Sequence, residues 1–185
     1  RQGGDKSIGG GGRIMKNGNN FKLLYCLLLI CQIVLCNFSP LGPYITLSLL
    51  PAMIFCIPMS VSTAACMIIA FGCGRAVDWL SEGLIGINAA SLVPVALARK
   101  SIVRIFFGED LITRGDSFSV NKYGTAKVSA ALMSSIAVFL LFYVILDGAG
   151  TRPMWFNLAY FGASLLCNWI LALLVTHLLT PDDRK

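Results

Sequence analysis

Two charged side chains at the end of a long uncharged segment are the first candidates for chemistry in this chain. Residues 23–74 contain no Asp, Glu, Lys or Arg, and Arg75 and Asp78 follow directly. A spacing of three residues on a helix brings two side chains within reach of each other. This intramembrane pair fits a proton or ion relay or a polar contact to a partner, and it also fits a mutually satisfied pair at the headgroup boundary. A relay needs a second titratable group at depth, and no other apolar segment offers a carboxylate there.

The remaining residue types give little support to catalysis or metal binding. The single histidine, His177, has no Ser or Asp at a recognisable catalytic spacing, and the chain lacks a Gly-x-Ser-x-Gly motif. None of the seven cysteines forms a Cys-x-x-Cys pair, which argues against a zinc site or a thiol-redox motif. We therefore expect no enzymatic activity, no cofactor and no metal, and we expect His177 to be a polar residue at a membrane interface.

The composition indicates what kind of protein positions these residues. Hydrophobic residues make up 56% of the 185 residues and charged residues 13%, with a mean hydropathy of +0.75. Soluble domains carry roughly 25% charged residues. The composition therefore excludes a soluble domain, a secreted disulfide scaffold, a nucleic-acid binder and a disordered regulator. It predicts an all-α integral membrane protein, with a compact bundle of about six transmembrane helices.

Pro and Gly clusters divide the apolar sequence into these six helices. The second predicted helix has Pro51 as an internal kink and is only about fourteen residues long, which is short for a membrane span. The fourth begins after the turn at residues 81–83 and runs beyond Arg104. The first, second, third, fifth and sixth helices are predicted at about residues 21–36, 44–58, 60–80, 123–146 and 154–179, respectively. We expect residues 1–14 to be a flexible leader or a cloning remnant, residues 15–180 to form a single domain, and residues 181–185 to be a cytoplasmic tail.

The net charge of +6 orients this bundle. Basic residues precede the first predicted helix and surround the connection between the fourth and fifth, so the positive-inside rule places both termini and that connection in the cytoplasm. Arg99, Lys100 and Arg104 form a basic cluster among apolar residues near the end of the fourth helix. We expect them to reach the headgroup region, either by snorkelling or on an interfacial continuation of the helix, and to contact anionic lipids. A cytoplasmic protein partner is the alternative.

A stripe of small residues follows the third predicted helix at intervals of four. Small side chains allow another helix backbone to approach closely. The stripe leads towards Asp78, and it fits packing within the chain better than a binding face for another protein. Its members are Ser62, Cys66, Ala70 and Gly74.

Residues 72–90, GCGRAVDWLSEGLIGINAA, resemble the signature of the rod shape-determining protein MreD family. The resemblance extends more weakly over about residues 15–179. It implies a non-enzymatic, multi-pass subunit of the bacterial inner membrane that maintains cell shape within the elongation machinery. Such proteins associate with MreC, and through it with MreB filaments, the glycosyltransferase RodA and a class B penicillin-binding transpeptidase, to organise peptidoglycan synthesis.

The resemblance implies a structural or partner-binding motif formed by Asp78, Gly83, Gly86, Asn88 and Ala89. The two glycines permit a turn after Asp78, across which the Asn88 amide is expected to hydrogen-bond to the Asp78 carboxylate. We hypothesise that this link fixes the angle between the third and fourth helices and so shapes a partner-binding face.

The chain departs from the family pattern at three positions. Arg75 stands where an aliphatic residue is usual, Leu84 where Pro is frequent, and Lys100 where Pro or Gly often follows the basic residue. These departures change the expected charge environment of Asp78 more than they weaken the resemblance to the family.

The alternative function is a substrate-binding membrane subunit of an energy-coupling-factor-type vitamin transporter, which is also a compact six-helix bundle. The Ala-x-x-x-Ala docking motif expected in its first helix is absent, because the first predicted helix contains no Ala. Asn157, Tyr160 and Asn168 are too few polar groups to predict a vitamin site.

Overall fold

The structure is a computed structural model that describes residues 11–38, 45–82, 86–109, 124–148 and 153–179. These residues form six α-helices and one short π-helix, and no strand occurs among them. The all-helical class is therefore confirmed. The helices are α1 (Gly11–Phe38), α2 (Leu50–Phe55), α3 (Thr63–Val77), α4 (Ile87–Phe107), α7 (Thr125–Gly148) and α8 (Met154–Leu179), and the π-helix η1 is Asp78–Glu82.

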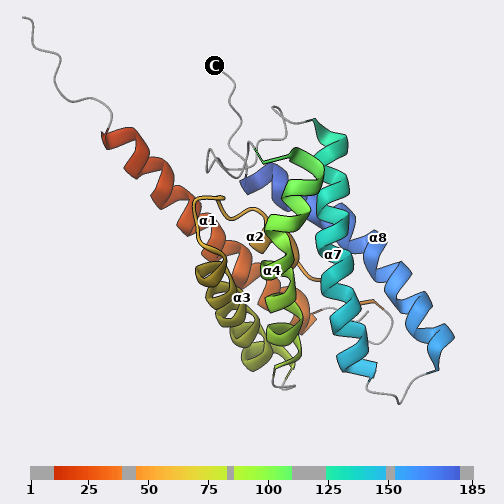
Figure 1. Cartoon of the computed structure of the whole chain (residues 1–185). Helices are drawn as coiled ribbons and strands as arrows, with labels where there is room; N and C mark the ends of the chain where they lie inside the picture. The colour runs from red at the N-terminus through yellow and green to blue at the C-terminus, as the bar shows by residue number, and fades with distance from the viewer. Residues whose placement is uncertain (1–10, 39–44, 83–85, 110–123, 149–152, 180–185) are drawn as a thin grey trace, which may run out of the picture.

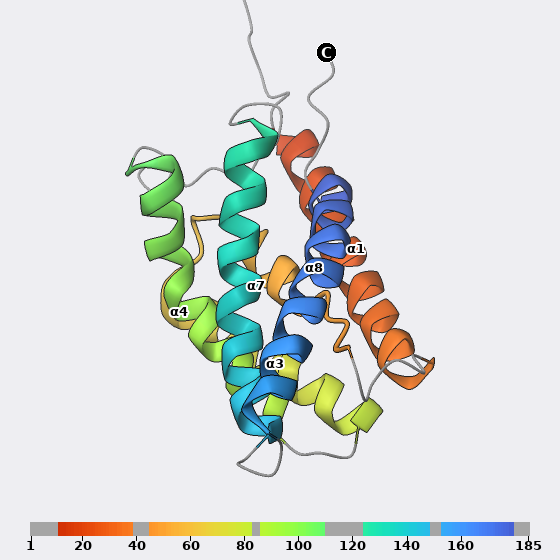
Figure 2. The same ribbon diagram turned by 90° about the vertical axis from the view of Figure 1, so that its right-hand side faces the viewer.

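The long helices run roughly along one axis, and the short α2 lies among them (Figure 1). Helix α4 packs between α3 and α7, and α8 packs against α7. The beginning of α1 and the end of α8 lie at the same end of the bundle, as the two views in Figures 1 and 2 show. The end of η1 and the beginning of α4 lie at the opposite end (Figure 1).

Three of the described helical segments are long and apolar enough to cross a membrane: Thr63–Leu80, Thr125–Gly148 and Met154–His177. The apolar part of α1, Leu23–Phe38, is shorter. Many large apolar side chains of these helices face outward, among them Leu27, Ile68 and Ile170. Outward-facing apolar side chains on long helices are typical of a protein surrounded by lipid.

The prediction of a second helix at residues 44–58 is wrong over most of that range. Residues 45–48 are not helical, and α2 contains only six residues. Pro51 does not kink a helix; it lies in the first turn of α2. Proline is tolerated there because the first N–H groups of a helix have no intrahelical acceptor. This part of the chain therefore passes through the bundle as a discontinuous crossing, which we define as residues 45–62.

Among the other boundaries, the start of α1 differs most from its prediction. Helix α1 begins at Gly11, inside the segment expected to be a leader and about ten residues before its predicted start. Ser62 ends the discontinuous crossing and caps α3, with its hydroxyl accepting a hydrogen bond from the Ala65 N–H. The last predicted helix, at residues 154–179, agrees with α8.

The core is centred on α2, all six residues of which are buried. Side chains from α3, α4, α7 and α8 surround it. Cys66, Ala70 and Gly74 of the small-residue stripe are buried on the α4 side of α3, whereas Ser62 is an exposed cap. The stripe thus serves packing within the chain.

Candidate functional site

Asp78 is the centre of a buried corner between α3 and α4. Its side chain is fully buried and accepts four hydrogen bonds. The backbone N–H groups of Gly86, Asn88 and Ala89 donate at 3.1, 3.0 and 3.2 Å, and the Asn88 side-chain amide donates at 2.9 Å. The carboxylate therefore caps the beginning of α4 from another helix, where unpaired N–H groups and the helix dipole favour negative charge.

The sequence explains why the corner folds this way. Gly86 has a φ of 103°, a left-handed conformation that favours glycine, and it lets the chain enter α4 with its N–H directed at Asp78. The predicted hydrogen bond from Asn88 to Asp78 is confirmed. Gly83, the other glycine of the predicted motif, lies outside the described residues.

Gly74 brings α3 and α4 into direct backbone contact beside this corner. A Cβ atom added to Gly74 would lie 2.5 Å from the Ala89 Cα atom, far inside van der Waals contact. Ala89 is itself buried. Gly74, Asp78, Asn88 and Ala89 therefore act as one unit, which we call the α3–α4 corner, and which sets the distance between the two helices.

The predicted ion pair between Arg75 and Asp78 is wrong. Arg75 is exposed on the outer side of α3, while the Asp78 carboxylate points inward to the beginning of α4. Four N–H donors occupy the carboxylate, so it needs no cationic neighbour. Among the described side chains the one ion pair joins the exposed Arg104 and Glu109 at 3.2 Å.

The predicted basic surface cluster is only partly correct, because Arg99 is buried. Its guanidinium donates to the backbone carbonyls of Phe55 and Ile57, the former at 3.3 Å, and contacts the Cys66 thiol at 3.8 Å. Helix α2 ends inside the bundle, and the guanidinium donates both to the carbonyl of its last residue, Phe55, and to that of Ile57, two residues beyond the helix.

The other two members of that cluster lie nearer the surface. Lys100 is half-buried and Arg104 is exposed.

Side chains also support the non-helical backbone before α2. The Asn168 amide accepts from the Ser48 N–H at 2.6 Å and donates to the Thr46 carbonyl at 2.6 Å. The Gln32 amide accepts from the Leu49 N–H at 2.6 Å and donates to the Leu47 carbonyl at 3.3 Å. We call Gln32, Tyr160, Ser164 and Asn168 the polar cradle.

The two remaining members of the cradle bind Thr46. The Ser164 hydroxyl accepts from its N–H at 3.0 Å, and the Tyr160 hydroxyl hydrogen-bonds to its side-chain hydroxyl. Sequence reasoning missed the cradle, although a signal was present: Gln32 and Asn168 are amides inside apolar helices. Such residues are expensive in a membrane unless they bind polar groups.

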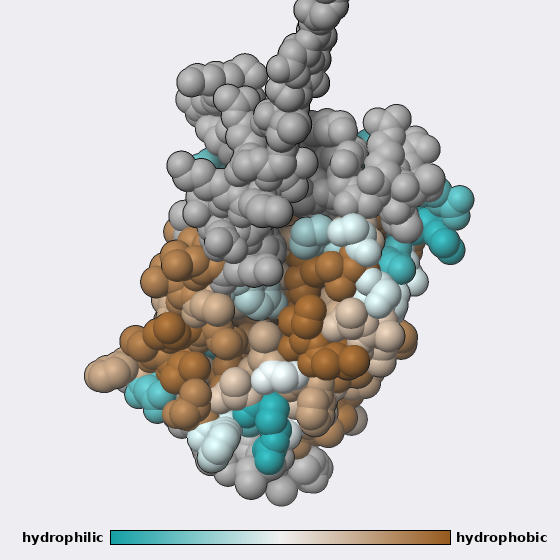
Figure 3. Space-filling view, turned by 90° about the vertical axis from the view of Figure 1, so that its left-hand side faces the viewer, coloured by the Kyte–Doolittle hydropathy of each residue, from teal (hydrophilic) through white to brown (hydrophobic). Residues whose placement is uncertain are grey.

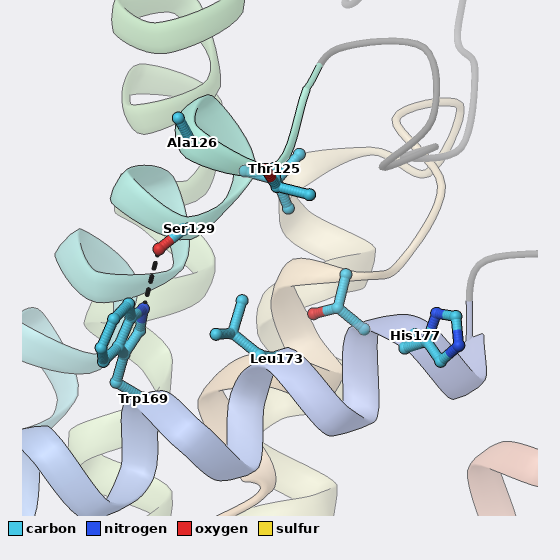
Figure 4. Close-up of a pocket in the computed structure, with 8 residues that line it drawn as sticks. Thr125, Ala126, Ser129, Trp169, Leu173 and His177 are labelled. Carbon is cyan, nitrogen blue, oxygen red and sulfur yellow. Dashed lines mark hydrogen bonds between the residues drawn. The ribbon is translucent and has the colours of Figure 1, made fainter.

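A groove of about 460 Å³ lies between the beginning of α7 and the end of α8 (Figure 4). The Trp169 indole N–H donates to the Ser129 hydroxyl at 2.9 Å across it. His177 is exposed at the end of α8 and lines the same groove with Leu173. None of the described residues that line it is a carboxylate, so these residues do not form a Ser–His–Asp arrangement.

The described residues contain no group of three or more His, Cys, Asp or Glu side chains that could hold a metal ion. What these residues do build is a set of intramolecular links: Asp78 to the beginning of α4, and Arg99 to the end of α2. Both links include α4, so this helix joins the motif segment to the centre of the bundle.

The chain was compared with family models, curated proteins and solved structures, and no match was found in any of the three.

Proposed function

We propose that this protein is a non-enzymatic scaffold subunit of the bacterial elongation machinery, similar to the MreD family. In this proposal it crosses the inner membrane six times, five times as a helix and once as the discontinuous crossing. Both termini lie in the cytoplasm, and the α3–α4 corner lies near the outer surface.

The observation that carries the proposal is the α3–α4 corner. The segment that resembles the family signature, residues 72–90, contains every residue of the corner. Asp78 is buried without a cation and is held entirely by N–H donors, which suits a structural fixture better than a proton carrier. A fixed angle between two helices is what a scaffold requires to present a constant surface.

The proposed partners are MreC and, in the larger complex, MreB, RodA and a class B penicillin-binding transpeptidase. Anionic lipids are proposed to contact Lys100 and Arg104, which remain available at the surface, whereas Arg99 is not. We propose no contact with nucleic acid.

Two variants of the corner test this function. Asp78→Ala and Asn88→Ala remove the acceptor and one donor of the capping network, and the exposed Glu109→Ala is the control. We expect both corner variants to insert in the membrane but to lose MreC on purification in mild detergent, while the control retains it. If both variants retain MreC as well as the parent does, the corner does not shape a partner surface.

Depletion in the native bacterium tests the function itself. Rounded cells with mislocalised wall synthesis are expected. Normal cell shape with a new vitamin requirement would favour the transporter alternative instead.

The polar cradle is the observation that favours that alternative. It gathers polar and aromatic side chains of α1 and α8, including Tyr160 and Asn168, at one place. In this structure the chain's own residues 46–49 occupy these groups. Mass spectrometry of a denatured, freshly purified sample separates the two functions, since a vitamin bound in stoichiometric amount would identify the transporter subunit.

A further inference from the structure

The outward side of α3 carries a cation without a counter-ion among the described side chains. Arg75 is exposed and lies within the apolar span Thr63–Leu80. The described ion pair elsewhere joins Arg104 and Glu109, and Asp78 points to α4. A guanidinium on a membrane-facing surface is costly unless a carboxylate or a headgroup meets it.

Arg75 belongs to an exposed stripe that follows α3 into η1, which we call the α3 seam. Its members are spaced by four, four, three and four residues, the spacing by which one helix packs along another. They are Ala64, Ile68, Gly72, Arg75 and Trp79, and all five are exposed. The exposed fractions of Ile68 and Trp79 are 72% and 82%.

Figure 3 shows the side of the molecule that carries α1 and α3, where apolar side chains cover much of the surface and the hydrophilic ones lie mainly towards its lower and right-hand margins.

Gly72 leaves a gap in the side chains of the seam, and no other described residue packs into this gap. A Cβ atom added to Gly72 would meet no atom within 4 Å, whereas one added to Gly74 would strike Ala89. Glycine in a helix interior costs about 1 kcal/mol relative to alanine. Gly72 therefore weakens α3 without improving any contact among the described residues, and its small size suits a helix that approaches from outside.

We propose that the α3 seam docks one transmembrane helix of another protein, and that Arg75 pairs with an Asp or Glu side chain of that helix. The proposal deepens the proposed function by naming a partner surface, and it rests on that function only in expecting MreC as the partner. Its physical basis is the charge of Arg75 and the shape at Gly72.

Two other occupants fit the seam less well. A second copy of this chain, related by a two-fold axis along the membrane normal, would place Arg75 against Arg75. A lipid phosphate can reach Arg75, but acyl chains are fluid and gain nothing from the close approach that Ala64 and Gly72 allow. A partner helix with a carboxylate satisfies both the charge and the shape.

Photocrosslinking in the native bacterium tests this surface. A benzophenone amino acid replaces Phe71, which is 55% exposed and flanks the seam without belonging to it, and Leu158 on α8, 75% exposed, is the control position. We expect the probe at position 71, and not the one at 158, to capture a single-span protein whose span carries Asp or Glu.

The charge of Arg75 gives the decisive measurement. Arg75→Glu is expected to lower the yield of that adduct about tenfold or more, because like charges then face each other, and exchange of the partner's carboxylate for Arg is expected to restore it. Gly72→Leu is expected to lower the yield without lowering the thermal stability, because a Cβ atom at this exposed position meets open space.

The outcomes separate this inference from the proposed function. Lipid adducts alone, an adduct of two copies of this chain, or a protein adduct that is indifferent to Arg75→Glu would each overturn the α3 seam. MreC that co-purifies without an adduct at position 71 overturns the seam and leaves the proposed function standing. A charge-dependent adduct with a different single-span protein supports the seam and contradicts MreC as its partner.

Discussion

Two buried ionic groups in this bundle are each balanced by backbone rather than by opposite charge. Asp78 accepts from the N–H groups at the beginning of α4, and Arg99 donates to the carbonyl groups at the end of α2. Helix ends carry partial charges of the required sign, so each ion meets a complementary field. Burial of one ion against a helix end needs fewer desolvated charges than burial of an ion pair.

Asp78→Asn tests this balance at the level of one atom. The substitution keeps the size of the side chain but replaces one acceptor oxygen by an NH₂ group, which then faces N–H donors. We expect a loss of at least about 2 kcal/mol in unfolding free energy, measured as a lower melting temperature in detergent. The exposed Glu109→Gln serves as the control, and equal melting temperatures of the two variants would contradict the capping role.

Gly74→Ala and Gly72→Ala form a matched pair on the same helix. The new methyl group at position 74 meets the Ala89 backbone, which cannot move aside as a flexible side chain can, whereas the one at 72 meets open space. We expect Gly74→Ala to destabilise the protein by about 1–3 kcal/mol and Gly72→Ala to be neutral or slightly stabilising. Thermal unfolding of both variants in one detergent measures the difference, and the reverse order would show that α3 and α4 are further apart.

At the scale of elements, the discontinuous crossing depends on side chains of neighbouring helices for hydrogen bonds that a continuous helix would make within itself. A helix satisfies its own backbone, but residues 45–48 do not form one. The polar cradle hydrogen-bonds to backbone groups of Thr46, Leu47 and Ser48, and Arg99 donates to the Phe55 carbonyl at the end of α2. Non-helical backbone at membrane depth is tolerated only where protein surrounds it in this way.

Arg99→Met tests the support at the end of α2. Methionine fills a similar volume but donates no hydrogen bond, so the carbonyl groups of Phe55 and Ile57 lose their guanidinium. We expect destabilisation of about 2–4 kcal/mol, whereas Arg104→Met, at an exposed ion pair, changes stability by less than about 1 kcal/mol. Melting temperatures in detergent measure both, and similar values for the two variants would show that Arg99 is dispensable.

An element could be predicted from the sequence when its hydrogen bonds form within the element or between residues close in sequence. Helix α8 agreed with its predicted bounds because a long apolar segment satisfies its own backbone and needs no information about its neighbours. The contact of Asn88 with Asp78 was predictable because it is local in sequence.

The discontinuous crossing was not predictable in the same way. Its acceptors and donors, Ser164 and Asn168, lie about 120 residues downstream, and only the fold brings them together. The prediction that Arg99 lies at the surface was wrong for the same reason, because its carbonyl partners lie more than 40 residues upstream.

At the scale of the whole molecule, the alternating direction of successive segments places the beginning of α1 and the end of α8 at one end of the bundle (Figure 1). The end of α4, with Arg104, lies at that same end (Figure 1). The beginning of α8 lies at the other end. Together with the distribution of basic residues, this arrangement leads to the proposed cytoplasmic position of both termini.

Cysteine accessibility in intact cells tests this orientation. In a cysteine-free background, Glu109→Cys and Met154→Cys place single exposed thiols at opposite ends of the bundle. We expect a membrane-impermeant maleimide to label position 154 from outside and position 109 only after the membrane is opened. The opposite labelling pattern would invert the proposed topology.

The polar cradle also constrains the order in which the protein is made. The discontinuous crossing leaves the ribosome long before Ser164 and Asn168 are synthesised, and by itself it cannot enter lipid, because its backbone groups would be unsatisfied there. We therefore expect it to remain outside the lipid until α8 is present. Without α8, the backbone N–H groups of Thr46 and Ser48 would lose their partners Ser164 and Asn168, so correct placement of this segment depends on a helix that is made more than 100 residues later.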